Sequence, residues 1–374
     1  MSKINTRSPY YITIGVSPAV ANLTQVDMQM YIYTGEKITD RSNLFQLSSF
    51  AINEIVTFEI SEIINDYIIN TFDGDYSSQN VWIDYRTRNY IQGAAGSYSA
   101  YTTLRGFNGY GYFEDGANPV NDSSLLQSNN KIVKLDDAPA VIAVDTETTN
   151  SVTYELNGEI VYTNTISTSL QSDEQIEYIS NTINGADEFE NRVIQDGGTF
   201  EDSICLQQFA GDFTLFDFDT IYIDTDSGID VITIDNVSEC KYQPHKVTFV
   251  NKFGALQDVW FFKRSNESLT TKKEDFKRNI IANGSYDTSR HQQKILTKNG
   301  KEKLTLNTGF YPEQYNEIFK QMQLSEDCWI EINNQTLPIT ISSSSFNYKT
   351  HLNDKLINYT IQIEFAFDTI NNIR

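Results

Sequence analysis

Only three cysteines and seven prolines occur in the 374 residues of this sequence. Cys205, Cys240 and Cys328 are odd in number and far apart, and no CxxC pair is present, which argues against a disulfide framework or a zinc site. No run approaches the ~18 apolar residues of a membrane span. The first residues, MSKINTRSPYYITIGV, lack the apolar core and cleavage site of a signal peptide. We therefore expect a protein made in the cytosol, with reduced thiols and no membrane span.

Recognisable catalytic patterns are also missing. The HExxH, GxSxG and phosphate-loop motifs do not occur, and His245, His291 and His351 have no partners at ligand spacing. We therefore predict that the protein is not an enzyme and that it uses no cofactor, apart from a weak calcium candidate. A polysaccharide hydrolase stays an alternative, because 50 carboxylates make acidic pairs by chance.

The calcium candidate lies in the Asp-rich segment 217–230. Asp224, Asp226 and Asp230 alternate around Gly228, and alternating oxygen ligands near a glycine turn suit Ca²⁺. The EF-hand pattern fails, however, because Gly228 occupies a ligand position and predicted hairpins flank the segment. The other interpretation is a plain Asp-rich turn.

Aromatic residues are abundant, with 22 Tyr and 22 Phe, and 39 % of the residues are apolar. This content excludes a disordered chain and is enough for a sizeable core. Strand-like alternation dominates the sequence. We predict a mainly β, multi-domain protein of β-sandwich or β-barrel modules with a few short flanking helices. The predicted domains are residues 1–138, 139–245 and 246–374.

The first predicted domain, residues 1–138, is β-rich with one short helix. Residues 25–35 and 81–91 alternate apolar and polar side chains. Residues 54–70 change from a period of two to helical spacing, which predicts a strand running into a short helix with Ser61 as its cap. Residues 93–119 are rich in Gly, Ser and Tyr and predict a long loop.

That loop is either a turn-rich excursion or a contact surface. Large, flat tyrosine side chains offer contact area at low entropic cost, and glycine lets the chain bend around a partner. The candidate interaction residues are Tyr98, Tyr101, Phe107, Tyr110 and Tyr112.

The second predicted domain, residues 139–245, has the short strands and frequent turns of a sandwich. Asn157-Gly158 supplies the positive φ of a type I′ hairpin turn. A second hairpin is predicted over 220–235, turning at residues 226–228. Residues 172–183 are compatible with a helix.

The third predicted domain, residues 246–374, begins with two strands around Gly254. The pattern of residues 271–274, TKKE, matches a capping box and predicts a short helix ending before Gly284. Further predictions are a hairpin on Asn299-Gly300, a helix over 311–322, a hairpin on Asn333-Asn334 and a last strand over 355–368. The last strand should pair with the strand that begins near Thr336. Its predicted buried face is Ile357, Tyr359, Ile361, Ile363, Phe365 and Phe367.

Charge is divided unevenly along the chain. Residues 1–240 contain 10 Lys and Arg against 36 Asp and Glu, whereas residues 263–303 contain 11 basic and 5 acidic residues. An acidic part joined to a basic segment allows attraction between copies, or docking of the two parts within one copy. The overall charge of −22 argues against general nucleic-acid binding.

Two places in the sequence share one plan. A predicted helix precedes a strand with Trp-Ile-acid at 82–84 and again at 329–331. The match is either a coincidence of a common packing unit or a sign that two similar barrels flank the central module.

Residues 304–372, from LTLNTGFYPEQYNEIFKQM to IQIEFAFDTINN, resemble the C-terminal part of tailed-bacteriophage virion structural proteins. In element order they are similar to tail-tube-like and distal-tail-like folds, which combine a small β-barrel or sandwich with one flanking helix. The resemblance implies a tail, baseplate or neck protein that is made in the host cytoplasm, is located in the virion, and has itself and other virion proteins as partners. It also implies that DNA passes without specific binding. A central sandwich departs from a simple tube subunit.

We therefore expect a phage structural protein that assembles as a ring or oligomer. The alternative is a receptor- or glycan-binding virion module that uses the Tyr/Gly loop. A polysaccharide hydrolase is the second alternative.

Overall fold

The computed structural model describes residues 2–16, 19–34, 44–77, 80–119, 123–166, 176–180, 182–183, 214–215, 218–343 and 356–370. Gly35, Cys205, Asp217 and His351 lie outside these ranges. Strands account for 57 % of the structure and helices for 7 %, which confirms the predicted β-rich fold class.

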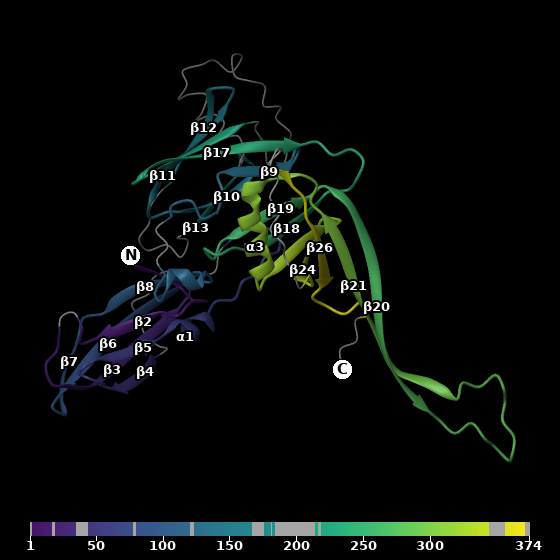
Figure 1. The fold of residues 1–374 in the computed structure, drawn as a ribbon, viewed down its shortest axis with the longest axis horizontal. Coiled ribbons are helices and arrows are strands. Elements are labelled where there is room, and N and C mark those ends of the chain that lie inside the picture. The colour runs from purple at the N-terminus through teal and green to yellow at the C-terminus, as the bar shows by residue number, and fades with distance from the viewer. Residues whose placement is uncertain are drawn as a thin grey trace. The chain divides into compact units, whose positions relative to one another are not determined.

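The chain divides into two compact units. Unit 1 comprises Met1–Ser238 and Thr248–Val259, and unit 2 comprises Glu239–Val247 and Trp260–Arg374. Figure 1 shows their strands and helices. The division into three domains at 138 and 245 stays a prediction.

The first sheet of unit 1 has the order β1-β8-β6-β3-β4, with β7 also paired to β6. β1 runs parallel to β8, and the other pairs are antiparallel. Its strands are β1 (Ser2–Asn5), β3 (Leu23–Tyr33), β4 (Leu44–Phe50), β6 (Asn80–Ile91), β7 (Ala94–Tyr98) and β8 (Thr102–Phe107). A smaller antiparallel pair joins β2 (Tyr11–Ile14) to β5 (Val56–Glu59).

One face of this sheet carries the first core. Val26, Met28, Met30 and Ile32 alternate along β3 and are at most 1 % exposed, as the period of two predicts. The helix α1 (Ser61–Asn65) adds Ile64 to the same core. The predicted cap is wrong: Ile60 is the N-cap residue, and the Ser61 hydroxyl donates backwards to Glu59.

The predicted long loop over 93–119 is wrong in its first half. Residues 94–98 and 102–107 form β7 and β8, both paired to β6. The sequence of β7, AAGSY, shows no apolar alternation, because most of this strand is exposed and no core selects apolar residues there. The rest of the segment is irregular apart from the short 3₁₀ helix η1 (Phe113–Asp115).

The second sheet of unit 1 has the order β12-β11-β16-β17-β9. Here β9 runs parallel to β17, and the other pairs are antiparallel. Its strands are β9 (Lys131–Leu135), β11 (Thr149–Leu156), β12 (Glu159–Thr165), β16 (Thr220–Thr225) and β17 (Gly228–Val237). Two further pairs are β10 (Val141–Asp145) with β13 (Ile176–Ser180), and β14 (Thr182–Ile183) with β15 (Thr214–Leu215).

Both hairpins predicted in this region are confirmed. Asn157 and Gly158, with φ of 52° and 88°, link β11 to β12, as a type I′ turn requires. Residues 226–227 link β16 to β17. The helix over 172–183 is not formed in the described residues of that range, because 176–180 and 182–183 are strands.

A seven-stranded sheet has the order β19-β18-β23-β24-β26-β21-β20. Its strands are β18 (His245–Val250), β19 (Leu256–Phe261), β20 (Lys263–Lys277), β21 (Gln293–Asn307), β23 (Cys328–Ile332), β24 (Gln335–Ile341) and β26 (Thr360–Phe365). β22 (Tyr311–Pro312) pairs with β25 (Leu356–Ile357). The turn at Gly254 and the hairpin on Asn333-Asn334 are confirmed.

The predicted helix over 311–322 begins later than expected. The 3₁₀ turn η2 (Glu313–Tyr315) precedes α3 (Asn316–Leu324), which is the longest helix in the described residues. The predicted face is confirmed, since its apolar side chains are at most 3 % exposed: Tyr315, Ile318, Phe319 and Met322. Phe319 packs against Tyr311 and Tyr359, with ring centroids 5.5 and 5.0 Å away.

Two predictions between residues 263 and 307 are wrong. The capping-box segment 271–274 lies inside β20, and Asn299-Gly300 lies inside β21. β20 and β21 are the two strands of one long ribbon. The chain reverses between them at a different Asn-Gly pair, Asn283 and Gly284, whose φ angles are 51° and 76°.

The strand predicted over 355–368 is split into β25 and β26. As predicted, β26 pairs with β24, but it also pairs with β21 on its other side. Ile357, Ile361 and Ile363 are buried, whereas Phe365 is half-buried and Phe367 is 44 % exposed. The predicted burial of Phe367 is wrong, because β26 ends at Phe365.

The two Trp-Ile-acid strands occupy similar positions. Each follows a short helix, and each lies between an earlier and a later strand: β6 between β3 and β8, and β23 between β18 and β24. The presence of two similar barrels stays a prediction.

The burial difference along the last strand gives a direct test. Ile363→Ala should lower the free energy of unfolding by about 2–5 kcal/mol, because Ile363 is 1 % exposed and its removal leaves a cavity. Phe367→Ala, which removes a larger but 44 % exposed side chain, should cost less than about 1 kcal/mol. Urea unfolding, monitored by hydrogen exchange of residues 304–341, measures the free energy of unfolding of both variants. Equal destabilisation by the two variants would contradict this assignment of the core.

Candidate interaction surfaces

Tyr98 and Tyr101 stack with arginines of β6. The Arg86 guanidinium lies 4.5 Å from the Tyr98 ring centroid and 4.7 Å from that of Tyr101. Arg88 lies 4.7 Å from Tyr98 and 5.2 Å from Tyr90. Each such contact stabilises by roughly 0.5–1 kcal/mol at an exposed site. These rings are therefore engaged within the sheet, on the face opposite the core.

Asp27 of β3 anchors this stack. Its Oδ2 accepts hydrogen bonds from Arg88 Nη2 at 2.7 Å and Tyr90 OH at 2.8 Å, and its Oδ1 accepts one from Ser48 Oγ at 2.7 Å. Gln25 Nε2 donates to Oδ1 at 3.1 Å. Burial alone would raise the pKa of Asp27, but these hydrogen bonds outweigh it and hold the pKa well below its ordinary value.

The other three candidate aromatics lie elsewhere. Phe107 is only 5 % exposed and packs in a core cluster, so it offers no contact area. Tyr110 and Tyr112 form an edge-to-face pair with centroids 5.8 Å apart, and Arg7 lies 4.9 Å above Tyr110. The most exposed aromatic of the segment is Phe113, at 99 %, which the sequence reasoning did not select.

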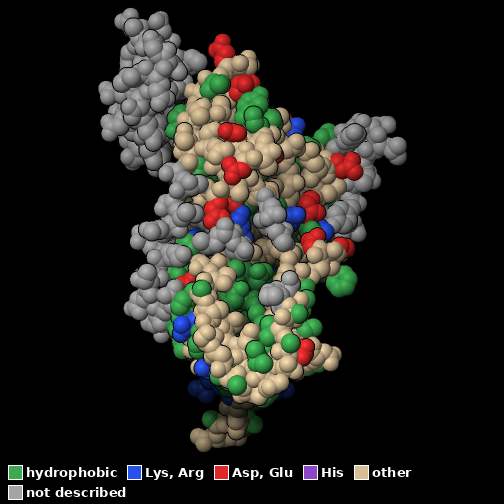
Figure 2. Space-filling view, turned by 90° about the vertical axis from the view of Figure 1, so that its left-hand side faces the viewer, with side chains coloured by type: hydrophobic (Ala, Val, Ile, Leu, Met, Phe, Trp, Pro, Cys, Tyr) green, Lys and Arg blue, Asp and Glu red, His purple; other side chains and the backbone are tan. Residues whose placement is uncertain are grey.

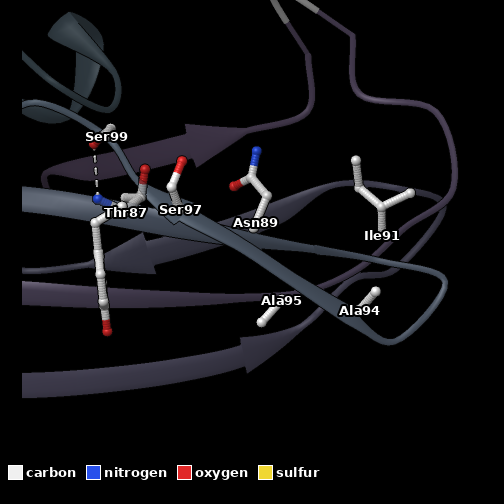
Figure 3. Close-up of a pocket in the computed structure, with 9 residues that line it drawn as sticks. Thr87, Asn89, Ile91, Ala94, Ala95, Ser97 and Ser99 are labelled. Atoms are coloured by element: carbon white, nitrogen blue, oxygen red, sulfur yellow. Dashed lines mark hydrogen bonds between the residues drawn. The ribbon is translucent and has the colours of Figure 1, made fainter.

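A shallow hollow of about 380 Å³ lies on the β6–β7 hairpin (Figure 3). Its lining is small and uncharged: Thr87, Asn89, Ile91, Ala94, Ala95, Gly96, Ser97, Tyr98 and Ser99. The Thr87 amide donates to Ser99 Oγ at 3.0 Å, which holds the end of β7 against β6. No Asp, Glu, His, Lys or Arg side chain lines the hollow.

The three predicted calcium ligands are not brought together. Asp224 pairs with Ile229, and Asp230 pairs with Ile223, so Asp224 and Asp230 point to opposite faces of the hairpin. Asp226 lies in the turn, 3.4 Å from Asn150 Nδ2. Within the described residues, no three His, Cys, Asp or Glu side chains are grouped closely enough to hold a metal ion.

The prediction that the cysteines are reduced core residues holds for Cys328 and is wrong for Cys240, which is exposed. His245 is buried, its Nε2 lies 3.3 Å from Ser265 Oγ, and burial lowers its pKa. Cys328 is buried, and burial raises its pKa to about 12. A thiol with so high a pKa is a poor nucleophile at neutral pH.

The basic segment forms a projecting arm, defined here as residues 263–303. It contains β20, most of β21 and the tip between them, and each strand is 15 residues long. Figure 1 shows the two strands running past the other strands of their sheet. Nearly all of its side chains are exposed, and β20 is the last strand of the sheet.

Apolar side chains are exposed along this arm among its lysines. The exposed fractions are 57 % for Leu269, 42 % for Phe276, 63 % for Ile281, 62 % for Tyr286, 46 % for Ile295 and 59 % for Leu296. Exposed apolar groups on a two-stranded ribbon have no core to enter, so they favour contact with another surface.

The base of the arm is fixed by the residues after β26. Asn299 Nδ2 donates to Asp368 Oδ2 at 2.9 Å, and the Thr369 amide donates to the Gly300 carbonyl at 2.9 Å. A Cβ atom on Gly300 would lie 2.8 Å from Leu269 Cδ1. Leu269 is 57 % exposed, so its side chain can move away from such a Cβ atom.

No protein-family model and no curated protein matches this chain. No helix in the described part of the chain has the length and apolar character needed to cross a membrane.

The Asp27 network predicts a pH-dependent stability. Asp27→Asn should lower the free energy of unfolding at pH 7 by about 1–3 kcal/mol, because it weakens charged hydrogen bonds. The folded-state pKa of Asp27 is depressed. Its stabilising contribution is therefore complete above the unfolded pKa of about 4 and is lost as the pH falls toward the folded pKa.

Urea unfolding at pH 7, 5 and 3 measures the difference between the wild type and Asp27→Asn. The difference should be similar at pH 7 and 5 and smaller at pH 3. Asp230→Asn is the control, because Asp230 is exposed. A difference that grows on acidification would contradict the assignment.

Proposed function

We propose that this protein is a structural subunit that assembles with copies of itself into a ring or short oligomer. The arm is the observation that carries the proposal. It is a ribbon of two 15-residue strands with exposed apolar groups and a basic charge, in a chain whose net charge is −22. Such a ribbon is marginally stable by itself and gains stability when a second surface covers it.

The composition of the arm favours a specific contact over aggregation. Lysines 272, 273 and 277 lie along β20, and the ladder with β21 is irregular between Glu274 and Asp275. Charges and bulges of this kind discourage indiscriminate pairing of an edge strand. A partner of opposite charge is not repelled by these lysines, and the acidic part of another copy is such a partner.

The resemblance of residues 304–372 supports a tailed-phage particle as the setting. In that setting the protein belongs to the tail, baseplate or neck, is made in the host cytoplasm, is located in the virion and has no catalytic role. The glycan-binding alternative gains less support, because Arg86 and Arg88 already stack on the rings of Tyr98 and Tyr101.

Shortening the arm tests the proposal. Residues 275–296 are replaced by Asn-Gly, which joins the paired residues Glu274 and Thr297 by a two-residue turn. The wild type should be oligomeric at micromolar concentration by mass photometry, and the shortened chain should self-associate at least tenfold more weakly. The shortened chain should still fold and unfold cooperatively on heating, because the removed side chains are nearly all exposed.

A wild type that is strictly monomeric would refute the proposed self-assembly. Its absence from purified phage particles, measured by mass spectrometry, would refute the proposed setting. An arm-shortened chain that assembles like the wild type would show that the arm is not the contact.

A further inference from the structure

The acidic charge is concentrated in one part of the chain. Residues 139–238 contain 20 Asp and Glu against the single basic residue Arg192, whereas residues 1–138 contain 15 acidic and 9 basic residues. The strands of the second sheet of unit 1 contain five acidic and two basic residues, so this sheet attracts a basic arm: Glu155, Glu159, Asp224, Asp230 and Asp235 against Lys131 and Lys134. In Figure 2, acidic side chains lie among hydrophobic ones over the region of β11 and β12.

That sheet has one buried face and one open face. Val152, Tyr154, Ile221, Ile223 and Ile232 are all 0 % exposed and form the core side. Side chains alternate along a strand, so the residues between them point to the other side.

The strand register defines the open face. Directly paired residues share a face, and Thr153 pairs with Tyr222, which pairs with Val231. On the neighbouring rows Asp224 pairs with Ile229, and Ile160 pairs with Glu155. We call these residues the acceptor face: Thr153, Glu155, Ile160, Tyr222, Asp224, Ile229 and Val231.

The acceptor face combines exposed apolar groups with acidic ones. Ile160 is 68 % exposed, Ile229 is 64 % exposed and Val231 is 41 % exposed. Glu155 lies beside Tyr222, 3.4 Å from its hydroxyl, and Asp224 is exposed on the next row. The face thus complements the arm in both respects: apolar groups oppose apolar groups, and carboxylates oppose lysines.

We propose that the arm of one copy docks on the acceptor face of a second copy. The proposal rests on the proposed function and specifies its contact. Leu269 and Ile295 share one face of the ribbon with Lys273 and Lys298. These apolar side chains cover Ile160, Ile229 and Val231, while the two lysines lie next to Glu155 and Asp224. Burial of the apolar groups drives the contact, and the charges select the partner and its orientation.

Two substitutions on the open face test the contact. Asp224→Lys with Val231→Lys reverses one charge and places a second lysine among the apolar groups, and it should weaken self-association at least tenfold. Asp230→Lys is the matched control. It makes the same charge reversal as Asp224→Lys alone, but Asp230 pairs with Ile223 and points to the other face, so assembly should be unchanged.

A mixing experiment identifies the occupant. The arm-shortened chain keeps its acceptor face, and the Asp224→Lys/Val231→Lys chain keeps its arm. Each should be monomeric alone, and the mixture should form heterodimers in mass photometry of differently tagged full-length chains. Circular dichroism and thermal unfolding establish that both variants are folded.

The outcomes separate the two proposals. A monomeric wild type refutes the proposed function itself. An oligomeric wild type with a still-oligomeric face variant refutes only the acceptor face and leaves the arm as the contact. Monomeric variants that do not combine when mixed refute docking between copies and indicate that the arm folds onto its own chain.

Discussion

The ladder between β21 and β26 is the constraint on which the arm depends. Leu304 and Leu306 of β21 pair with Ile363 and Ile361 of β26, and all four are at most 3 % exposed. The ladder ends at Lys303, whose ammonium group pairs with Glu364. Beyond that point β21 continues with β20 as its ribbon partner, so the same strand is a core element at one end and a projecting element at the other.

In this arrangement β26 completes the sheet and also supports the first part of the arm. β26 lies between β24 and β21, and the residues that follow it bond to Asn299 and Gly300. These bonds extend the support by several residues along β21. Two-stranded ribbons are marginal in water, so the position of β26 determines which part of the arm is held by the body of unit 2 and which part extends beyond that support.

The sequence predicted well those strands that have one buried face. In β3 and β26 apolar residues occupy every second position, because those positions face a core. Alternation of apolar and polar residues could not reveal the ribbon, because both of its faces are exposed to solvent. Its Lys, Thr and Glu residues are also compatible with a helix. Asn299-Gly300 shows the limit of turn signals: the same dipeptide makes a turn at 283–284, whereas at 299–300 it pairs with Lys272 and Thr271 inside the ribbon.

The candidate surfaces were only partly predictable. Counting charges located the basic segment and the acidic half, because charge is a property of the sequence alone. The stack of Arg86, Arg88 and the tyrosines needs the cross-strand register of β3, β6 and β7, which local patterns do not contain. The acceptor face likewise exists only once Asp224 and Ile229 are paired.

A contact between an arm and a different surface has a consequence for assembly. Each copy then carries two unlike, complementary sites, so binding at one site leaves the other available for the next copy. Such a chain of contacts ends only when the last copy meets the first, which gives a ring, or else it continues as a filament. The excess of acidic groups opposes unlimited growth through like-charge repulsion. Closure into a ring satisfies every arm and every acceptor face without adding further charge, and this favours a ring over a filament.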